Sequence, residues 1–316
     1  DENAYKTERY HNLYPKPGEP FTYEDFTRGQ FLKKGMTEFI SSLLTKNILV
    51  EYNPIVFHNI RIINKINKEA LQRSFNLTEN MDNLTQMSKS EGKSGSLFFI
   101  THDHKFFIKI IPERELDSLL NNIIKNYYNY IAEKNVTYLL KIYFAFTLTV
   151  GLTKVHAIVM ENVAPISSSK IVYKFDLKGS RDGRITKHIF TSKSAKFKTL
   201  KDLDYIDLKK SGSNVSVSIK QKESFSILTT LWNDVNFLSK ANVMDYSLFL
   251  AIVKYEPHLE QICQGKLRSQ NGDYVYFMGI IDFLTEYDLR KLITQLTSMA
   301  TQKLDQEKVK FKYILF

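Results

Sequence analysis

The stretch that most constrains the fold runs from residue 90 to residue 112 and reads SEGKSGSLFFITHDHKFFIKIIP. Two apolar runs, 97–100 and 106–111, flank the polar residues 102–104, a pattern typical of a β-hairpin. A glycine-containing segment precedes the first run. We therefore predict a glycine loop followed by two antiparallel strands with a tight turn between them.

Lys109 is the one charged residue of the second run. Because side chains alternate along a strand, Phe107 and Ile111 share its face, and the other face is apolar as well. Burying an ammonium group among apolar side chains costs free energy unless an anion lies beside it. Backbone N–H groups of a glycine loop are suited to phosphate. The hairpin therefore predicts a nucleotide site in which Lys109 meets phosphate.

The composition limits the class of protein. The 316 residues carry a formal net charge of +10 and are 43% hydrophobic, which is typical of a folded chain with an anionic partner such as a nucleotide, a nucleic acid or an anionic membrane. A single cysteine, Cys263, excludes an internal disulfide framework and a multi-cysteine zinc site. The longest apolar stretch, 139–152, is shorter than the roughly 20 residues of a spanning helix. We expect a soluble, cytosol-facing protein without a signal peptide.

The N-terminal half predicts helices around the hairpin. Residues 1–20 are expected to form an irregular arm. Apolar residues between 31 and 43 recur at helical spacing and predict a helix. This helix either packs on its own domain or forms a basic amphipathic surface that contacts a membrane or a second subunit. Residues 51–76 read as helix and 80–89 as a polar connector. After Pro112 a helix is predicted, with the apolar stripe Leu116, Leu119, Leu120, Ile123, Ile124 and Tyr127.

The second half predicts further strands and one long helix. The predicted strands are 139–150, 155–160, 172–177, 248–253 and 274–281, with a connector between lobes at 161–165. Between residues 187 and 222 nine lysines predict a solvated loop or a membrane-facing patch, and the few aromatic residues there disfavour nucleic acid. A helix is predicted over 224–240, with a core face made of Phe225, Leu228, Leu231, Trp232, Val235 and Leu238. The tail from residue 289 has helical spacing.

Three charges stand beside or inside apolar strands: Lys109, Asp245 and Asp282. A lysine for nucleotide phosphates, an aspartate for the acceptor hydroxyl and an aspartate for magnesium are the minimal equipment for phosphoryl transfer. The alternative is that Asp245 caps a turn and Asp282 caps a following helix. GKS at 92–94 is not a Walker A loop, because Met87 stands where the first glycine is needed. The HRD and DFG motifs of protein kinases are missing too.

Seven segments, in order, resemble the phosphatidylinositol phosphate kinases. They are EYNPIVFHNIRIIN at 51–64, SGSLFF at 94–99, FFIKI at 106–110, KFDLKGS at 174–180, KDLDY at 201–205, VMDYSLFL at 243–250 and YFMGIIDFLTEYD at 276–288. DLKGS and MDYSL in this order are the most specific. The resemblance implies an α+β fold of two lobes, distantly related to protein kinases, with an antiparallel sheet and packed helices in each lobe. It implies an arm at 1–50, an N-lobe at 51–163 and a C-lobe at 164–316.

The resemblance implies a site for ATP in the N-lobe and at the hinge. Lys109 is expected to hold the α- and β-phosphates. The residues expected over the phosphates are Ser94, Gly95 and Ser96, and those expected at the hinge beside adenine are Met160, Glu161, Asn162 and Val163.

In the C-lobe the resemblance implies catalytic aspartates and a phosphate-binding floor. Asp245 of MDYSL is expected to orient or deprotonate the attacking hydroxyl, and Asp282 of IID to bind Mg²⁺. Asp176 and Lys178 of DLKGS are expected to organise the floor of the site and its phosphate contacts. Lys178 and Arg184 are the candidates for substrate binding, Arg184 for the ring phosphate of the lipid.

The chain departs from the family pattern at two places. The family pairs its strand lysine with a glutamate of the next helix, whereas Ser118 aligns there, with Glu115 and Asp117 a turn or less away. The family follows IID with a lysine-rich activation loop that helps to choose the substrate and engage the membrane. Here the corresponding run is RKLITQLTSMATQKLDQ, with few lysines.

We interpret the sequence as a phosphatidylinositol phosphate kinase that uses ATP and Mg²⁺, with phosphatidylinositol 4-phosphate 5-kinase favoured over 5-phosphate 4-kinase. The alternative is a weak or inactive kinase-like scaffold that binds phosphoinositides. A nucleic-acid-binding protein is a third reading, suggested by charge alone. We expect a phosphoinositide in an anionic membrane surface as partner, no nucleic acid, and a possible homodimer. The expected location is peripheral, on the cytosolic face of a membrane, foremost the plasma membrane.

Overall fold

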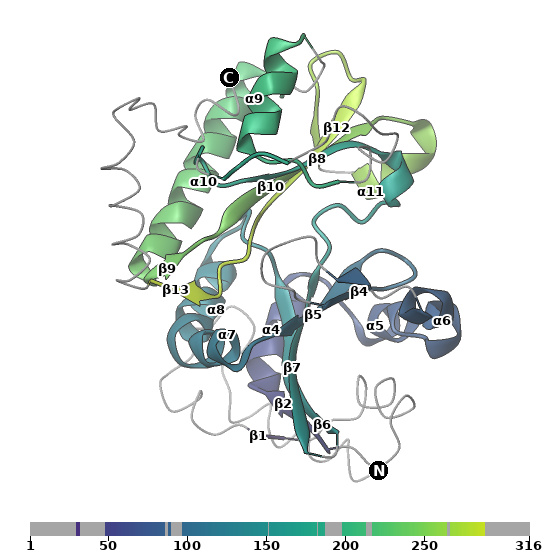
Figure 1. Cartoon of the computed structure of the whole chain (residues 1–316), viewed down its shortest axis with the longest axis vertical. Helices are drawn as coiled ribbons and strands as arrows, with labels where there is room; N and C mark the ends of the chain where they lie inside the picture. The colour runs from purple at the N-terminus through teal and green to yellow at the C-terminus, as the bar shows by residue number, and fades with distance from the viewer. Residues whose placement is uncertain are drawn as a thin grey trace. The chain divides into compact units, whose positions relative to one another are not determined.

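The computed structural model describes residues 30–31, 48–85, 88–89, 97–150, 152–181, 183–186, 198–212, 217–263 and 266–287. The chain divides into two compact units (Figure 1). Unit 1 consists of Asp1–Val136 and Leu140–Asn162, and unit 2 of Thr137–Leu139 and Val163–Phe316. The glycine loop at 94–96 and the tail from 289 lie outside the described residues, as does the helix predicted around 31–43 except for its first residue, Phe31, which belongs to strand β1 and not to a helix.

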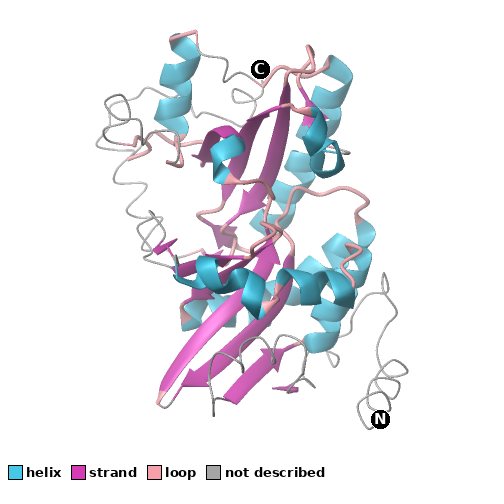
Figure 2. Cartoon of the chain, turned by 90° about the vertical axis from the view of Figure 1, so that its right-hand side faces the viewer, coloured by secondary structure: helices cyan, strands magenta, loops and turns pink. Residues whose placement is uncertain are grey.

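Unit 1 is built on a seven-stranded antiparallel sheet (Figure 2). The strands, in their order across the sheet, are β1 (Gln30–Phe31), β2 (Ile48–Tyr52), β6 (Ile142–Val150), β7 (Thr153–Glu161), β5 (Phe106–Ile111), β4 (Leu97–Ile100) and β3 (Ser88–Lys89). The predicted hairpin is confirmed as β4 and β5 with their predicted bounds. β5 occupies an interior position of the sheet, between β4 and β7.

The helices of unit 1 correct two predictions. Residues 51–76 do not form one helix: β2 continues to Tyr52, and α4 (Pro54–Ile63) and α5 (Lys68–Ser74) follow. Asn53 and Lys65 have positive φ angles of 42° and 58°, which turn the chain at both ends of α4. The predicted connector at 80–89 is wrong as well, because α6 (Leu77–Thr85) and β3 occupy it.

The helix predicted after Pro112 is confirmed, with one irregularity. It runs through α7 (Glu113–Asp117), the π-helical turn η1 (Ser118–Ile123) and α8 (Ile124–Glu133). The predicted stripe is buried apart from Leu120, which is half-buried. The consecutive Tyr127 and Tyr128 of α8 are both fully buried.

Unit 2 contains a four-stranded antiparallel sheet in the order β11 (Leu267–Arg268), β12 (Tyr274–Ile281), β10 (Ser247–Lys254) and β8 (Ile171–Leu177). A separate pair is formed by β9 (Val243–Met244) and β13 (Thr285–Glu286). The predicted strand from residue 139 begins only at Ile142, because Leu139 forms an isolated bridge with Ile280 of β12. Short helical segments are η2 (Ser168–Lys170), η4 (Pro257–Leu259) and α11 (Glu260–Cys263).

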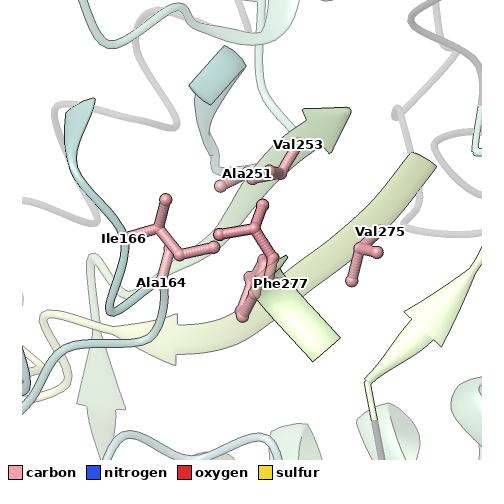
Figure 3. Packing of buried hydrophobic residues seen from close by; sticks show 7 residues of the cluster. Ala164, Ile166, Ala251, Val253, Val275 and Phe277 are labelled. Atoms are coloured by element: carbon pink, nitrogen blue, oxygen red, sulfur yellow. The ribbon is translucent and has the colours of Figure 1, made fainter. Parts of the chain in front are cut away.

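The core of unit 2 lies where the segment after Asn162 meets β10 and β12. Figure 3 shows Ala164 and Ile166 packed against residues of the two strands, among them Ala251 and Phe277. Gly279 of β12 is required there, because a Cβ atom at this position would lie 2.7 Å from Cγ2 of Val163. The buried cluster thus holds the segment that begins at Val163 against the sheet of unit 2.

Two further predictions in unit 2 are corrected. The lysine-rich region is not all loop, because α9 (Asp202–Lys210) forms within it. The predicted helix over 224–240 is confirmed as α10 (Gln221–Lys240), but two members of its predicted core face, Phe225 and Trp232, are exposed. The buried side instead includes Asp234, which accepts hydrogen bonds of 2.7 Å from Oγ1 of Thr137 and from the backbone N–H of Tyr138. None of the described helices is both long and apolar enough to cross a membrane.

Candidate functional site

In unit 2 the ends of three neighbouring strands bring Lys178, Asp245 and Asp282 to one end of the sheet. Lys178 follows the last residue of β8, which pairs with Leu248 of β10. Asp245 precedes β10, whose first residue pairs with the last residue of β12, and Asp282 follows directly. Adjacent strands lie about 4.8 Å apart. The sheet register therefore gathers three predicted site residues.

Asp245 and Asp282 are also bracketed by two sets of strand pairs. Ser247 pairs with Ile281 on one side, and Met244 pairs with Thr285 on the other. Between these pairs two residues face three, and both aspartates adopt left-handed backbone conformations, with φ angles of 63° and 60°. Such conformations are uncommon outside glycine and cluster at functional sites. The alternative that Asp282 caps a following helix is wrong, because a turn and β13 follow it.

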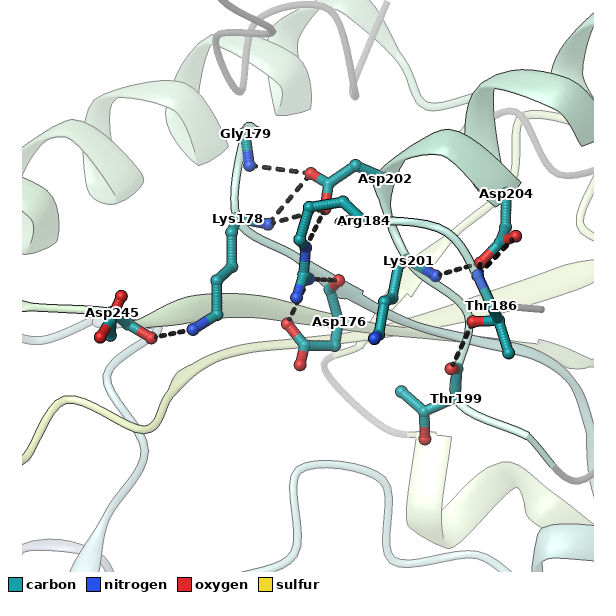
Figure 4. A network of polar contacts seen from close by, with 10 residues as sticks. All are labelled: Asp176, Lys178, Gly179, Arg184, Thr186, Thr199, Lys201, Asp202, Asp204 and Asp245. Carbon is teal, nitrogen blue, oxygen red and sulfur yellow. Dashed lines mark hydrogen bonds and ion pairs between the residues drawn. The ribbon is translucent and has the colours of Figure 1, made fainter. Parts of the chain in front are cut away.

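Lys178 connects the DLKGS segment to Asp245. Its Nζ donates a hydrogen bond of 2.6 Å to the backbone carbonyl of Asp245 (Figure 4). The next residue, Gly179, has a φ of 68°, which suits glycine in the turn that directs the chain away from β8. The lysine ammonium therefore lies beside the backbone of the predicted catalytic aspartate.

Arg184 bridges two carboxylates in the same region (Figure 4). Its Nη2 lies 2.9 Å from Oδ1 of Asp176, and its Nε lies 2.8 Å from Oδ2 of Asp202. Burial alone lowers the pKa of Arg184, but the hydrogen bond with Asp202 and the negative charge of Asp176 outweigh burial and raise this pKa above its usual value. Arg184, which the resemblance predicts to bind the ring phosphate of the lipid, thus forms ion pairs with two acids of the protein.

Asp202 is the residue of this network that the sequence reasoning missed. Its carboxylate is 1% exposed and accepts the backbone N–H groups of Lys178 and Gly179 besides Nε of Arg184. Two residues later, Asp204 accepts the backbone N–H groups of Thr186 and Lys201. Acidic residues at the first turn of a helix are a known start signal. The KDLDY segment therefore carried a signal for α9, but none for the contacts with the DLKGS loop.

In unit 1 Lys109 meets an anion of the protein itself. The Nζ of Lys109 lies 3.7 Å from Oε2 of Glu115, and the two side chains are only 9% and 12% exposed. The ring of Phe98 lies 5.9 Å from the same ammonium. Ser118, which aligns with the glutamate of the family, is buried. Of the residues offered by the sequence, Glu115 on α7 pairs with the lysine.

The end of β7 carries the residues predicted at the hinge. Met160 pairs with Phe107 of β5 and is buried. The Glu161 carboxylate accepts the backbone N–H of Lys141 at 2.8 Å. Asn162 donates through Nδ2 to the His104 carbonyl at 2.7 Å. The Asn162 contact ties the end of unit 1 to the hairpin turn, while Val163 belongs to unit 2.

Comparison with known proteins decides the family. The family model described as Phosphatidylinositol-4-phosphate 5-Kinase matches residues 78–266, more than half of the chain. This chain belongs to the phosphatidylinositol phosphate kinase family. The family's α+β fold agrees with the mixed helices and antiparallel sheets of both units.

Curated relatives come from both branches of this kinase family. Phosphatidylinositol 4-phosphate 5-kinase 7 of Arabidopsis thaliana is 32% identical over 64% of this chain and 25% of the relative. Phosphatidylinositol 5-phosphate 4-kinase type-2 alpha of Rattus norvegicus is 28% identical over 76% of this chain and 68% of the relative. A probable phosphatidylinositol phosphate kinase of Dictyostelium discoideum is 32% identical over 82% and 35%. The chain thus spans a quarter to about two thirds of the length of these relatives.

The residues of the site fit a metal that is held jointly with phosphates. Among the described residues, no three His, Cys, Asp or Glu side chains cluster as a metal site made of protein alone. Mg²⁺ is usually bound by one or two carboxylates together with substrate phosphates and water. Asp282 follows β12 and has a carboxylate of the kind that such a site requires, and Lys178 lies at the same end of the sheet.

Proposed function

We propose that this kinase-family chain transfers the γ-phosphate of ATP to a ring hydroxyl of a mono-phosphoinositide. The observation that carries the proposal is the placement of Asp245 and Asp282 side by side, both in left-handed conformations, between two sets of strand pairs. Phosphoryl transfer needs one carboxylate for the acceptor hydroxyl and one for magnesium. This pair supplies both from a single sheet end.

Each residue has a distinct role in this proposal. Asp245 orients the attacking hydroxyl and accepts its proton, and the Lys178 ammonium beside the Asp245 carbonyl favours bound phosphate nearby. Asp282 holds Mg²⁺, which neutralises charge on the phosphate oxygens. In unit 1 Lys109 contacts the α- and β-phosphates while Glu115 keeps it in position. The residues from Met160 to Val163 meet adenine, and Ser94, Gly95 and Ser96 cover the phosphates.

We propose phosphatidylinositol 4-phosphate as the substrate and the 4,5-bisphosphate as the product. The support is the description of the matching family model and the name of the Arabidopsis relative. The rat relative is named for the other isomer, so the product isomer has to be measured. The lipid substrate lies in an anionic membrane surface, so we propose that the enzyme acts there as a peripheral protein. The net charge of +10 favours that surface.

The test is turnover by the purified chain on vesicles that contain each mono-phosphoinositide in turn, with Mg-ATP. The wild type is expected to convert the 4-phosphate, and Asp282→Asn is expected to lower kcat at least about 100-fold because charge stabilisation of the transition state is lost. Asp207→Asn is the matched control, because Asp207 is an exposed acid on α9. If the wild type turns over none of the lipids but binds the vesicles, the chain is a phosphoinositide-binding scaffold and the enzymatic proposal fails.

A further inference from the structure

Helix α10 presents two large aromatic side chains to solvent. Phe225 is 75% exposed and Trp232 is 67% exposed, whereas Ile227, Leu231 and Leu238 of the same helix are buried. The positions are seven residues apart, so they lie two turns apart, about 10 Å along the axis, on nearly the same side. Thr229, which lies between them on this side, is exposed as well. We name Phe225, Thr229 and Trp232 the aromatic face of α10.

The charges around the aromatic face are positive. Lys222 lies one turn before Phe225, and Lys240 lies at the end of the helix, two turns after Trp232; both are exposed. The two carboxylates of α10 point elsewhere. Asp234 is buried and hydrogen-bonded to Thr137, and Glu223 is about 160° away from Phe225 around the helix axis at 100° per residue.

The size of the face favours a lipid surface over a folded partner. A fully buried Phe or Trp covers about 150–250 Å², so the two rings together fall well short of the roughly 800 Å² that each side of a stable protein interface buries. A membrane interface needs less area: aromatic side chains insert beside the headgroups, and lysines near an anionic leaflet add about 1 kcal/mol each. Aromatic rings flanked by lysines are complementary to such a surface.

We propose that the aromatic face of α10 docks on an anionic lipid bilayer, with Phe225 and Trp232 inserted at the headgroup level and Lys222 and Lys240 beside lipid phosphates. The choice of a bilayer over a peptide rests in part on the proposed function, because its substrate is a lipid. Docking through this face holds unit 2, which carries Asp245 and Asp282, at the surface that contains the substrate.

The chain contains its own reporter for this contact, because Trp232 is its single tryptophan. Fluorescence of the wild-type chain is measured with phosphatidylcholine vesicles that contain phosphatidylserine. We expect a blue shift of the emission and quenching by brominated lipids. If the protein co-sediments with these vesicles while its emission stays that of a solvent-exposed tryptophan, the aromatic face does not touch the bilayer and the proposal is overturned. A blue shift that grows with protein concentration in the absence of lipid would overturn it in favour of self-association.

Variants measure the contribution of the face to binding. Phe225→Ser keeps the reporter and is expected to weaken vesicle partitioning about tenfold, the loss expected when one buried aromatic side chain no longer leaves water. Val136→Ser is the matched control, because Val136 is also well exposed but lies in unit 1. Equal partitioning of both variants and the wild type would contradict the proposal.

Vesicle partitioning needs no turnover, so this result is independent of the proposed function. An inactive chain that still inserts Trp232 refutes the kinase activity and supports the docking face. An active chain whose Phe225→Ser variant partitions and turns over as the wild type refutes the docking face alone.

Discussion

The two units each contain a buried cation, and the cations are balanced differently. In unit 1 Nζ of Lys109 lies 3.7 Å from Oε2 of Glu115, and this Oε2 atom has no hydrogen-bond partner among the described residues. In unit 2 Arg184 has two acids, Asp202 at 2.8 Å and Asp176 at 2.9 Å, both within hydrogen-bond distance. The Lys109–Glu115 contact is thus an ion pair beyond hydrogen-bond distance, whereas both contacts of Arg184 with its acids are directed hydrogen bonds.

The difference predicts that the two ion-pair contacts contribute differently to stability. An ammonium 3.7 Å from its partner can approach a phosphate without giving up a hydrogen bond to that partner. The Arg184 guanidinium donates hydrogen bonds from two of its nitrogen atoms to carboxylates. Its partner Asp202 also accepts hydrogen bonds from the backbone N–H groups of Lys178 and Gly179. We therefore expect the network in unit 2 to contribute more to stability than the ion pair in unit 1.

The largest effect is expected for Asp202→Ala. Removing one member of a buried, hydrogen-bonded ion pair typically costs about 3–5 kcal/mol, and we expect the lower end of this range because Arg184 keeps Asp176 as a partner. The change also leaves the N–H groups of Lys178 and Gly179 without this acceptor. Urea unfolding should show a loss of this size. Asp207→Ala, at an exposed position of the same helix, should change the free energy of unfolding by less than about 0.5 kcal/mol.

A smaller loss is expected for Glu115→Gln. The substitution removes the charge opposite Lys109 but breaks no hydrogen bond of Oε2, so about 1–2 kcal/mol of unfolding free energy should be lost. The KM for ATP should rise as well, because the lysine is no longer held in place. Glu113→Gln, an exposed acid on the same short helix, is the control. A loss as large as that of Asp202→Ala would contradict the proposed contrast between the two cations.

The smallest effect concerns Asp103 in the hairpin turn and depends on pH. Burial raises the pKa of Asp103, but hydrogen bonds from Ser74 and Thr101, with further contributions from Lys105, lower it below its usual value overall. A carboxyl whose pKa is lowered by folding stabilises the fold fully above its unfolded pKa of about 3.9 and loses this contribution as the pH falls through the folded value.

Asp103→Asn should therefore cost about 1 kcal/mol of unfolding free energy at pH 7, and this difference should shrink as the pH falls below about 4. Urea unfolding of both proteins at several pH values measures it. A difference that is constant from pH 7 to pH 3 would show that the charge of Asp103 does not stabilise the turn, and that the hairpin is held by its strand pairs alone.

The local sequence pattern predicted the strands and helices that carry the candidate site more accurately than it predicted the neighbouring segments. The hairpin, the helix after Pro112 and the strand ending at Ile281 appear where alternation and spacing place them. The segment 80–89 was misread because its polar residues suggested a loop. Asn80 is instead buried, where it donates to the Ser74 carbonyl and accepts the His102 N–H. The His102 N–H comes from 22 residues away in the sequence, and no local pattern reveals such a partner.

The same limit explains the errors on α10 and α9. Helical spacing located α10 but could not tell which of two apolar sides is covered; Asp234 faces inward because Thr137 and Tyr138, far away in sequence, bind it. On α9 the lysines suggested a solvated loop, yet Asp202 and Asp204 bind residues 178–186 from its first turn. The distant partners outweighed the local signal in both helices.

The sequence by itself determined the family and the strands of the site, because these follow from motif order and local composition. It also identified Lys109, Asp245 and Asp282 as charges that need partners. Only the tertiary structure decided which partners they have. Glu115 rather than Ser118 faces Lys109, and Asp202 anchors the loop of Lys178. The strand register sets Asp245 beside Asp282. Burial raises the free-energy cost of an unpaired charge, and only the packed chain shows which side chains share a buried space.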